Sequence, residues 1–115
     1  MNIVLDTNCL IMSIAPKSPY RNIWNAFLRG DYKLCVSNEI IEEYSEVLAR
    51  NLSPQISEAI IYAILTRPNV IRLDPHFSFG LIDADKDDNK FVDCAIASNA
   101  KCIVTEDEHF KVLET

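Results

Sequence analysis

The stretch Asp83–Asp107, DADKDDNKFVDCAIASNAKCIVTED, decides the fold prediction. In order, it has the pattern of an acidic loop, a helix, a short apolar strand and a carboxylate at the end of that strand. Eight of the chain's 17 acidic residues lie between Asp83 and Glu108. If the helix and strand pack as neighbours in an α/β layer, Asp88 at the helix start and Asp107 at the strand end share the carboxyl edge of the sheet. Open parallel sheets bind their ligands at this edge.

The rest of the chain alternates short apolar segments with longer segments of helical period, which is typical of a parallel sheet flanked by helices. The expected strands are 2–5, 32–36 and 70–73, and the expected helices are a short one after residue 8, then 20–29, 38–51 and 54–66. Ser37 is a candidate N-cap, and Ser53-Pro54 is a candidate N-cap and N1 pair. In the helix 54–66 we expect the large apolar side chains to be buried, namely Ile56, Ile60, Ile61, Ile64 and Leu65.

Size and composition favour one domain, 1–115, because 115 residues and 13.1 kDa suffice for a single core. No apolar run reaches the ~18 residues of a membrane span, and the start MNIVLDTN lacks signal-peptide features, so we expect a cytoplasmic protein. The four cysteines form no C-x-x-C pair and are expected to be reduced core residues: Cys9, Cys35, Cys94 and Cys102.

The net charge of −6 and pI near 4.8 argue against a broad basic surface for nucleic acid. A nucleic-acid site in this chain would need cations held by carboxylates, since hard divalent ions take oxygen ligands.

The glutamates of the helix 38–51 are not equivalent on a helical wheel. The apolar arc consists of Ile40, Ile41, Tyr44, Val47 and Leu48. Glu42 and Glu46 lie opposite that arc, and Glu39 lies well away from its centre. Glu43, in contrast, lies on the flank of the arc, roughly 90° from its centre. Only Glu43 is expected to reach a site beside the core.

The same period separates the acids of the last helix. Asp88 lies above the stripe that we expect to face inward, made of Phe91, Val92, Ala95, Ile96 and Asn99. Asp93 lies roughly 140° from Asp88 and is expected to point outward.

Four carboxylates from four separate elements can therefore meet at one edge: Asp6, Glu43, Asp88 and Asp107. Carboxylates within ~4–6 Å of one another repel unless a cation is bound. A Mg²⁺ or Mn²⁺ pair removes this repulsion, holds a phosphodiester and activates water, so no side-chain nucleophile is needed.

Simpler roles compete for each acid taken alone. Asp88 could be a helix N-cap, Glu43 a solvated helix side chain, and Asp107 a cap for the next turn. Lys90 beside the acidic helix start is either a solvated charge or a contact to a phosphate backbone, as are three other cations, Lys17, Arg21 and Lys86.

Other site classes fit less well. Asp83, Asp85 and Asp87 have the spacing of the first three ligands of a calcium loop. However, Asp88 stands where that loop needs Gly and Cys94 where it needs Glu. A phosphatase nucleophile at the first motif would lack its second acid, because that position is Asn8. His76 and His109 have no partner spacing and are expected at the surface.

Four stretches in order resemble the motifs of the PIN-domain family, and most closely the VapC-like toxins of bacterial toxin-antitoxin pairs. They are NIVLDTN at 2–8, SNEIIEEYSEVL at 37–48, DDNKF at 87–91 and IVTED at 103–107.

The resemblance implies a three-layer Rossmann-like sandwich with a parallel sheet of four or five strands. It also implies a Mg²⁺- or Mn²⁺-dependent ribonuclease acting on single-stranded or structured RNA, a homodimer and a cognate antitoxin. The metal-site and catalytic acids would be Asp6, Glu43, Asp88 and Asp107, with Asn8 and Thr105 as supporting polar residues.

The chain departs from the family pattern in two places. It stops at Thr115, soon after the fourth motif, where relatives usually continue into another strand, so we expect the edge to be truncated. Asp85 and Asp93 are extra acids near the third motif and leave open which Asp binds metal there. A non-catalytic binding module with the same fold is the competing interpretation.

Overall fold

The computed structural model describes residues 1–73, 89–98, 100 and 102–104. Its sheet has four strands in the order β3-β2-β1-β4, and every neighbouring pair is parallel. The strands are β1 (Asn2–Leu5), β2 (Lys33–Val36), β3 (Val70–Arg72) and β4 (Cys102–Val104). The register pairs Ile3 with Leu34 on one side of β1 and Leu5 with Val104 on the other. The predicted parallel sheet is therefore confirmed.

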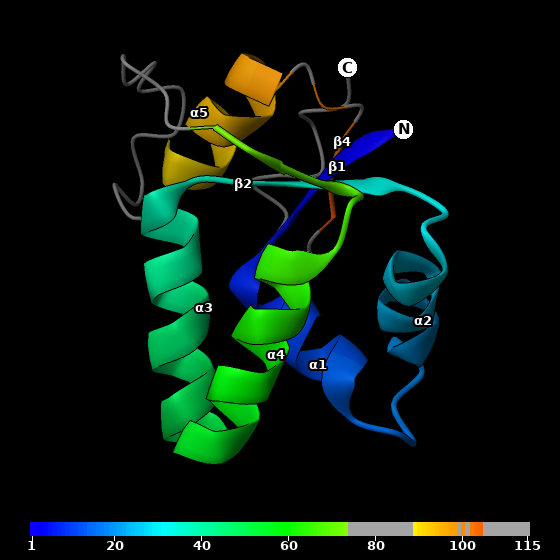
Figure 1. The fold of residues 1–115 in the computed structure, drawn as a ribbon, viewed down its shortest axis with the longest axis vertical. Coiled ribbons are helices and arrows are strands. Elements are labelled where there is room, and N and C mark those ends of the chain that lie inside the picture. The colour runs from blue at the N-terminus through cyan, green and yellow to red at the C-terminus, as the bar shows by residue number, and fades with distance from the viewer. Residues whose placement is uncertain (74–88, 99, 101, 105–115) are drawn as a thin grey trace.

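Helices cover both faces of this sheet. They are α1 (Thr7–Ile14), α2 (Arg21–Arg29), α3 (Asn38–Asn51), α4 (Pro54–Thr66) and α5 (Asn89–Ser98). Figure 1 shows α1 to α4 on one side of the strands and α5 on the other. The strand interiors are accordingly buried from both sides, with Val4, Leu34 and Val36 completely inaccessible. Within the described ranges, no helix has both the length and the apolar character needed to cross a bilayer.

Local capping signals place the helix ends close to where the sequence predicts them. The Ser37 hydroxyl accepts a hydrogen bond from the N–H of Ile40, and the Ser53 hydroxyl accepts one from the N–H of Ile56. The helix α2 ends at Gly30, whose φ of 80° is the left-handed conformation that glycine adopts without strain. These caps therefore set the end of α2 and the starts of α3 and α4.

The cysteine prediction is confirmed for the residues with described side chains. Cys9, Cys35 and Cys94 are buried and reduced. Burial raises the pKa of the Cys35 thiol, which makes that thiol a poor nucleophile and agrees with a purely structural role.

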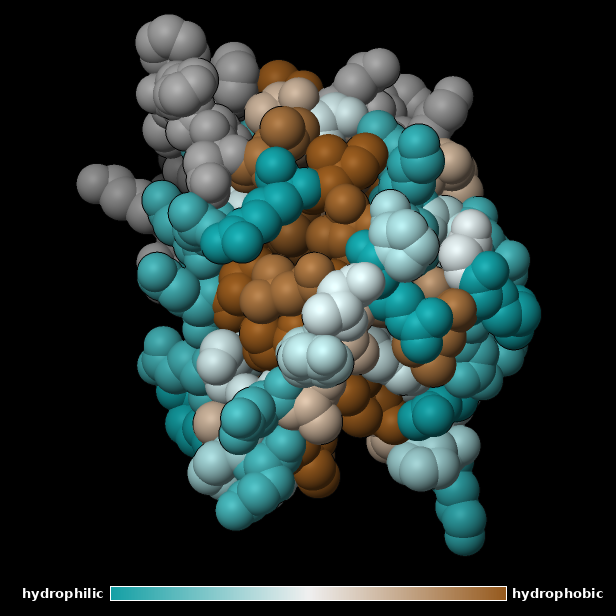
Figure 2. All heavy atoms as spheres, viewed as in Figure 1, coloured by the Kyte–Doolittle hydropathy of each residue, from teal (hydrophilic) through white to brown (hydrophobic). Residues whose placement is uncertain are grey.

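The prediction for α4 is wrong in part. Ile64 is fully buried and Ile60 and Ile61 pack against the core, but Ile56 and Leu65 are exposed. The structure packs α4 on α3 through the face that carries Ser57, Ile60, Ile61 and Ile64. Ser57 is itself buried and donates a 2.8 Å hydrogen bond to the carbonyl oxygen of Ser45. Ile56 and Leu65 flank that face by roughly a quarter turn each. Figure 2, which has the same view as Figure 1, shows apolar side chains over the middle of this face, in and above the region of α4, with hydrophilic side chains around them.

The prediction for α5 also needs correction. Asp93 is only 8% exposed, whereas Ile96 is 41% exposed, the reverse of the wheel prediction. Five consecutive residues of α5, 91–95, are all buried, including the neighbours of Asp93, Val92 and Cys94. Burial here changes along the helix axis as well as around it, and a helical wheel cannot represent that change.

Candidate active site

Asp6 lies at the carboxyl edge of the sheet, directly after β1, the strand between β2 and β4. It is the N-cap of α1, and its carboxylate accepts a 3.4 Å hydrogen bond from the N–H of Asn8. The Asn8 side chain is exposed. The predicted position of Asp6 at the carboxyl edge of the sheet is therefore observed.

Glu43 lies on α3 and is half-buried, while Glu39, Glu42 and Glu46 on the same helix are exposed. This difference arises because α3 presents Ile40, Tyr44 and Leu48 to the core, which turns the Glu43 position toward the edge of that buried face. The wheel prediction for the glutamates is confirmed.

The carboxylate of Glu43 joins three helices. The Thr7 hydroxyl at the start of α1 donates a hydrogen bond to Glu43 Oε2, and the Lys90 ammonium on α5 lies 2.8 Å from Glu43 Oε1. Because Thr7 follows Asp6 directly, these contacts bring two of the four predicted acids to the same edge of the sheet. Both Glu43 oxygens are held by charged or polar groups of the protein.

A second contact fixes the same two chain segments to each other. The hydroxyl of Tyr44 donates a 2.5 Å hydrogen bond to the carbonyl oxygen of Leu5. Tyr44 follows Glu43, and Leu5 precedes Asp6. Burial raises the pKa of Tyr44 well above its ordinary value, and the carboxylates of Asp6 and Glu43 act in the same direction.

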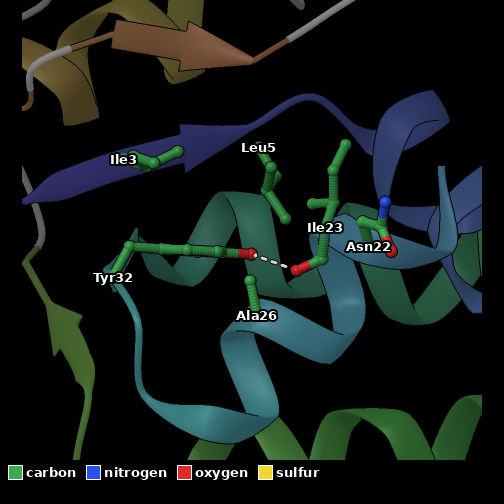
Figure 3. Close-up of a pocket in the computed structure, with 6 residues that line it drawn as sticks. All are labelled: Ile3, Leu5, Asn22, Ile23, Ala26 and Tyr32. Carbon is green, nitrogen blue, oxygen red and sulfur yellow. Dashed lines mark hydrogen bonds between the residues drawn. The ribbon is translucent and has the colours of Figure 1, made fainter.

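Two hollows in the surface differ in chemistry. A depression of about 300 Å³ beside Glu43 is lined by charged side chains, namely Glu39, Glu42, Glu43, Glu46 and Lys90. A hollow of about 230 Å³ between β1 and α2 is lined by Ile3, Leu5, Asn22, Ile23, Ala26 and Tyr32 (Figure 3). In this second hollow the Tyr32 hydroxyl already donates to the carbonyl oxygen of Ile23 at 2.9 Å. Of these two hollows, the first offers the charged groups that ionic chemistry requires.

The donor set at the edge suits a hard divalent cation. Asp6 and Glu43 supply carboxylate oxygens, and Thr7 adds a hydroxyl that orients one of them. Among the described residues, no three acidic, histidine or cysteine side chains form a complete metal cluster. The predicted site residues Asp88, Asp107 and Thr105 lie outside the described residues, as does Asp85.

Three contributors to this site were missed by sequence reasoning. The sequence predicts either a solvated charge or a phosphate contact for Lys90, and neither is the observed ion pair with Glu43. Thr7 and Tyr44 were not singled out as site residues. For Tyr44 a signal exists, since a hydroxyl on a buried apolar arc usually requires a hydrogen-bond acceptor.

Comparisons with known proteins agree with this architecture. The family model for the PIN domain matches residues 2–109. The crystal structure of VapC20 from Mycobacterium tuberculosis, described as a sarcin-ricin loop cleaving toxin, is similar with a TM-score of 0.71 and 12% identity. That alignment covers 96% of this chain and 94% of that chain. VapBC2 from Rickettsia felis, bound to a DNA fragment from its promoter, has a TM-score of 0.67 and 20% identity over 97% of this chain and 92% of that chain.

At these identities the two structures show a shared fold. A search of curated proteins finds no match. The family model, in contrast, spans nearly the whole chain, from the first strand to beyond the fourth motif. The protein therefore belongs to the PIN domain family.

Proposed function

We propose that this protein is a Mg²⁺- or Mn²⁺-dependent endoribonuclease that hydrolyses phosphodiester bonds of RNA, acting as the toxin of a toxin-antitoxin pair. The observation that carries the proposal is the contact between Thr7 and Glu43, which joins the helix start beside Asp6 to the inward glutamate of α3. Family membership supports the same reading. The similar VapC20 is a sarcin-ricin loop cleaving toxin, which supports RNA as the substrate class.

In this proposal Asp6, Glu43, Asp88 and Asp107 hold the metal, and Asn8 and Thr105 support them. When bound, the metal supplies an activated water and stabilises the negative charge that develops on the phosphate. The chain's own contribution is to hold the acids in place before the substrate arrives. Thr7 fixes the orientation of the Glu43 carboxylate, and Tyr44 ties α3 to the end of β1.

The charge of the chain fits this role for the metal. With a net charge of −6 and a depression lined mainly by glutamates, the protein would repel an RNA backbone by itself. Divalent cations at the edge would reverse the local sign where the phosphate binds.

The test is cleavage of a single-stranded RNA by the full chain with Mg²⁺ or Mn²⁺. We expect Asp6→Asn and Glu43→Gln to lower cleavage at least ~100-fold. Glu58→Gln, at an exposed position of α4, should keep wild-type activity. Glu58→Gln is a matched control, since it makes the same chemical change on a helix outside the charged depression. No cleavage by wild type, or full activity in Asp6→Asn, would overturn the proposal.

One observation favours a second candidate, a non-catalytic module that acts by binding a protein. Both oxygens of Glu43 are engaged by protein groups, so the glutamate is satisfied without a metal. A titration with Mn²⁺ separates the two candidates. The module predicts no saturable Mn²⁺ binding, whereas the nuclease predicts binding that is lost in Asp6→Asn.

We also propose a cognate antitoxin as partner and a homodimer as the working assembly. The similar structure of VapBC2 supports a protein partner. Sedimentation equilibrium of the full chain tests the dimer. For the partner, the test is inhibition of RNA cleavage by the product of an adjacent small gene. A monomer at all concentrations would refute the dimer proposal, and undiminished cleavage would refute the partner proposal.

A further inference from the structure

The ion pair between Lys90 and Glu43 differs from the other ion pairs among the described residues. Its Nζ–Oε1 distance is 2.8 Å, and the two side chains are only 12% and 27% exposed. The pairs Arg29–Asp31 and Arg50–Glu46 are more than half exposed on both sides. Solvent and salt therefore screen the Lys90–Glu43 pair much less than the surface pairs.

Lys90 supplies the charge that a metal would otherwise supply. A half-buried carboxylate loses hydration and needs a compensating cation or hydrogen bonds. Glu43 obtains one hydrogen bond from Thr7 and a full positive charge from Lys90. In the metal-free protein, the glutamate assigned to the metal site is thus already neutralised by the chain itself.

A divalent cation and the Lys90 ammonium compete for this carboxylate. Mg²⁺ binds carboxylate oxygens at ~2.1 Å. An ammonium that stays 2.8 Å from Glu43 Oε1 would then lie within about 5 Å of a dication bound to the same oxygen. Repulsion between a single and a double positive charge at that separation is strong in a poorly hydrated site.

The surroundings of Lys90 offer its ammonium another position. The lysine side chain is a flexible stem with three rotatable donors. Lys90 lines the same depression as Glu39, Glu42 and Glu46, all of which are exposed carboxylates. An ammonium released from Glu43 can therefore remain near negative charge without returning fully to solvent.

From these contacts we propose that Lys90 is an internal counter-cation that occupies Glu43 in the metal-free protein and must withdraw when a divalent cation binds. Lys90 is thus a positioning residue that sets the metal affinity of the site. The inference rests on the proposed function for one point, the assignment of Glu43 as a metal ligand. It does not depend on which RNA is cleaved.

The test measures Mn²⁺ binding to the full chain by calorimetry, with no RNA present. Lys90→Met keeps the length of the stem and removes the charge, so we expect it to tighten Mn²⁺ binding by roughly tenfold or more, equivalent to about 1.4 kcal/mol. Lys90→Arg keeps the charge and should remain within about threefold of wild type. Lys33→Met removes an exposed lysine at the start of β2 and controls for the change in net charge.

A folding defect in Lys90→Met would be recognised by circular dichroism, and Lys90→Gln then serves as the second variant. A nuclear magnetic resonance measurement on the wild type tests the same point without either variant. The side-chain resonance of isotopically labelled Lys90 should shift on titration with diamagnetic Mg²⁺, in step with saturation of the site.

The outcomes separate this inference from the proposed function. Mn²⁺ binding in Lys90→Met and Lys90→Gln that is equal to or weaker than wild type overturns the role of Lys90, even if RNA is cleaved. An equal tightening of Mn²⁺ binding in Lys33→Met overturns it as well, because the effect would then come from the change in net charge and not from the contact with Glu43. Tighter binding in the Lys90 variants without RNA cleavage by any variant supports the counter-cation and refutes the nuclease. Absence of Mn²⁺ binding in wild type and all variants overturns both.

Discussion

The hydroxyl of Tyr44 donates a 2.5 Å hydrogen bond to the carbonyl oxygen of Leu5, and this bond connects the residue after Glu43 to the residue before Asp6. Both groups are completely or almost completely buried. A buried carbonyl without a donor is costly, so the bond fixes the distance between α3 and the end of β1. The two acids of the candidate site that the structure describes are held together by this bond and by Thr7.

We expect Tyr44→Phe to destabilise the protein by about 1–2 kcal/mol, because it leaves the buried Leu5 carbonyl unpaired while keeping the ring. RNA cleavage should fall more than stability alone explains, since Asp6 loses the restraint on its neighbour. Urea unfolding and cleavage assays measure the two effects. Tyr62→Phe, at an exposed position of α4, is the matched control. A loss of stability no larger in Tyr44→Phe than in Tyr62→Phe would show that the bond is unimportant.

The Lys90–Glu43 pair should contribute more to stability than the Arg50–Glu46 pair one turn further along α3. In the absence of metal, we expect Glu43→Gln to cost about 1–3 kcal/mol, because it leaves the mostly buried Lys90 without its carboxylate. Glu46→Gln breaks an exposed pair at 3.6 Å and should cost less than about 0.5 kcal/mol. Equilibrium unfolding of both variants at low and high salt measures this difference. Equal costs, or a Glu43→Gln effect abolished by salt, would contradict the described burial of the pair.

Much of the fold could be predicted because its signals are local. Ser37 and Ser53 mark helix starts through hydrogen bonds to residues three positions ahead, and the period of α3 separates Glu43 from its neighbours. Parallel pairing follows from the alternation of strands and helices. These features require no knowledge of which element packs against which.

The parts that could not be predicted depend on tertiary packing. The pairing of Lys90 with Glu43 joins residues far apart in the chain, and no sequence period encodes it. Asp93 is buried because residues 91–95 of α5 are covered on all sides. In α4 the face that packs on α3 includes the small polar Ser57, whereas the sequence pattern predicts Ile56 and Leu65 there.

The packing of α4 gives a prediction on two isoleucines of the same helix. Ile64→Ala should cost about 2–5 kcal/mol, since Ile64 is fully buried against the core. Ile56→Ala should cost less than about 1 kcal/mol, because 41% of Ile56 is already exposed. Thermal and urea unfolding of the pair compare the same chemical change at two depths. Similar losses at both positions would restore the sequence-based prediction that both are buried.

The two buried tyrosines should lower the free energy of unfolding at alkaline pH. The pKa values of Tyr32 and Tyr44 are raised above their ordinary value of 10.0, chiefly by desolvation. Below about pH 9 the folded and unfolded chains both keep these protons, so the shifts contribute no pH dependence. Above about pH 10 the unfolded chain releases protons that the folded chain retains. The free energy of unfolding should then fall by about 1.4 kcal/mol per pH unit for each buried tyrosine.

The comparison of wild type with Tyr44→Phe isolates the contribution of the Tyr44 proton to the pH dependence of stability. Other titrating groups, including Cys35, contribute equally to both proteins. At about pH 8 the variant should be the less stable of the two, owing to the unpaired Leu5 carbonyl. As the pH rises above about 10, wild type loses stability faster, and the gap should close by about 1.4 kcal/mol per pH unit. Urea unfolding from about pH 8 to about pH 11 measures this gap. A gap that stays constant over that range would mean that the Tyr44 phenol titrates alike in both states, and that its hydroxyl is not held in the dry contact between α3 and β1.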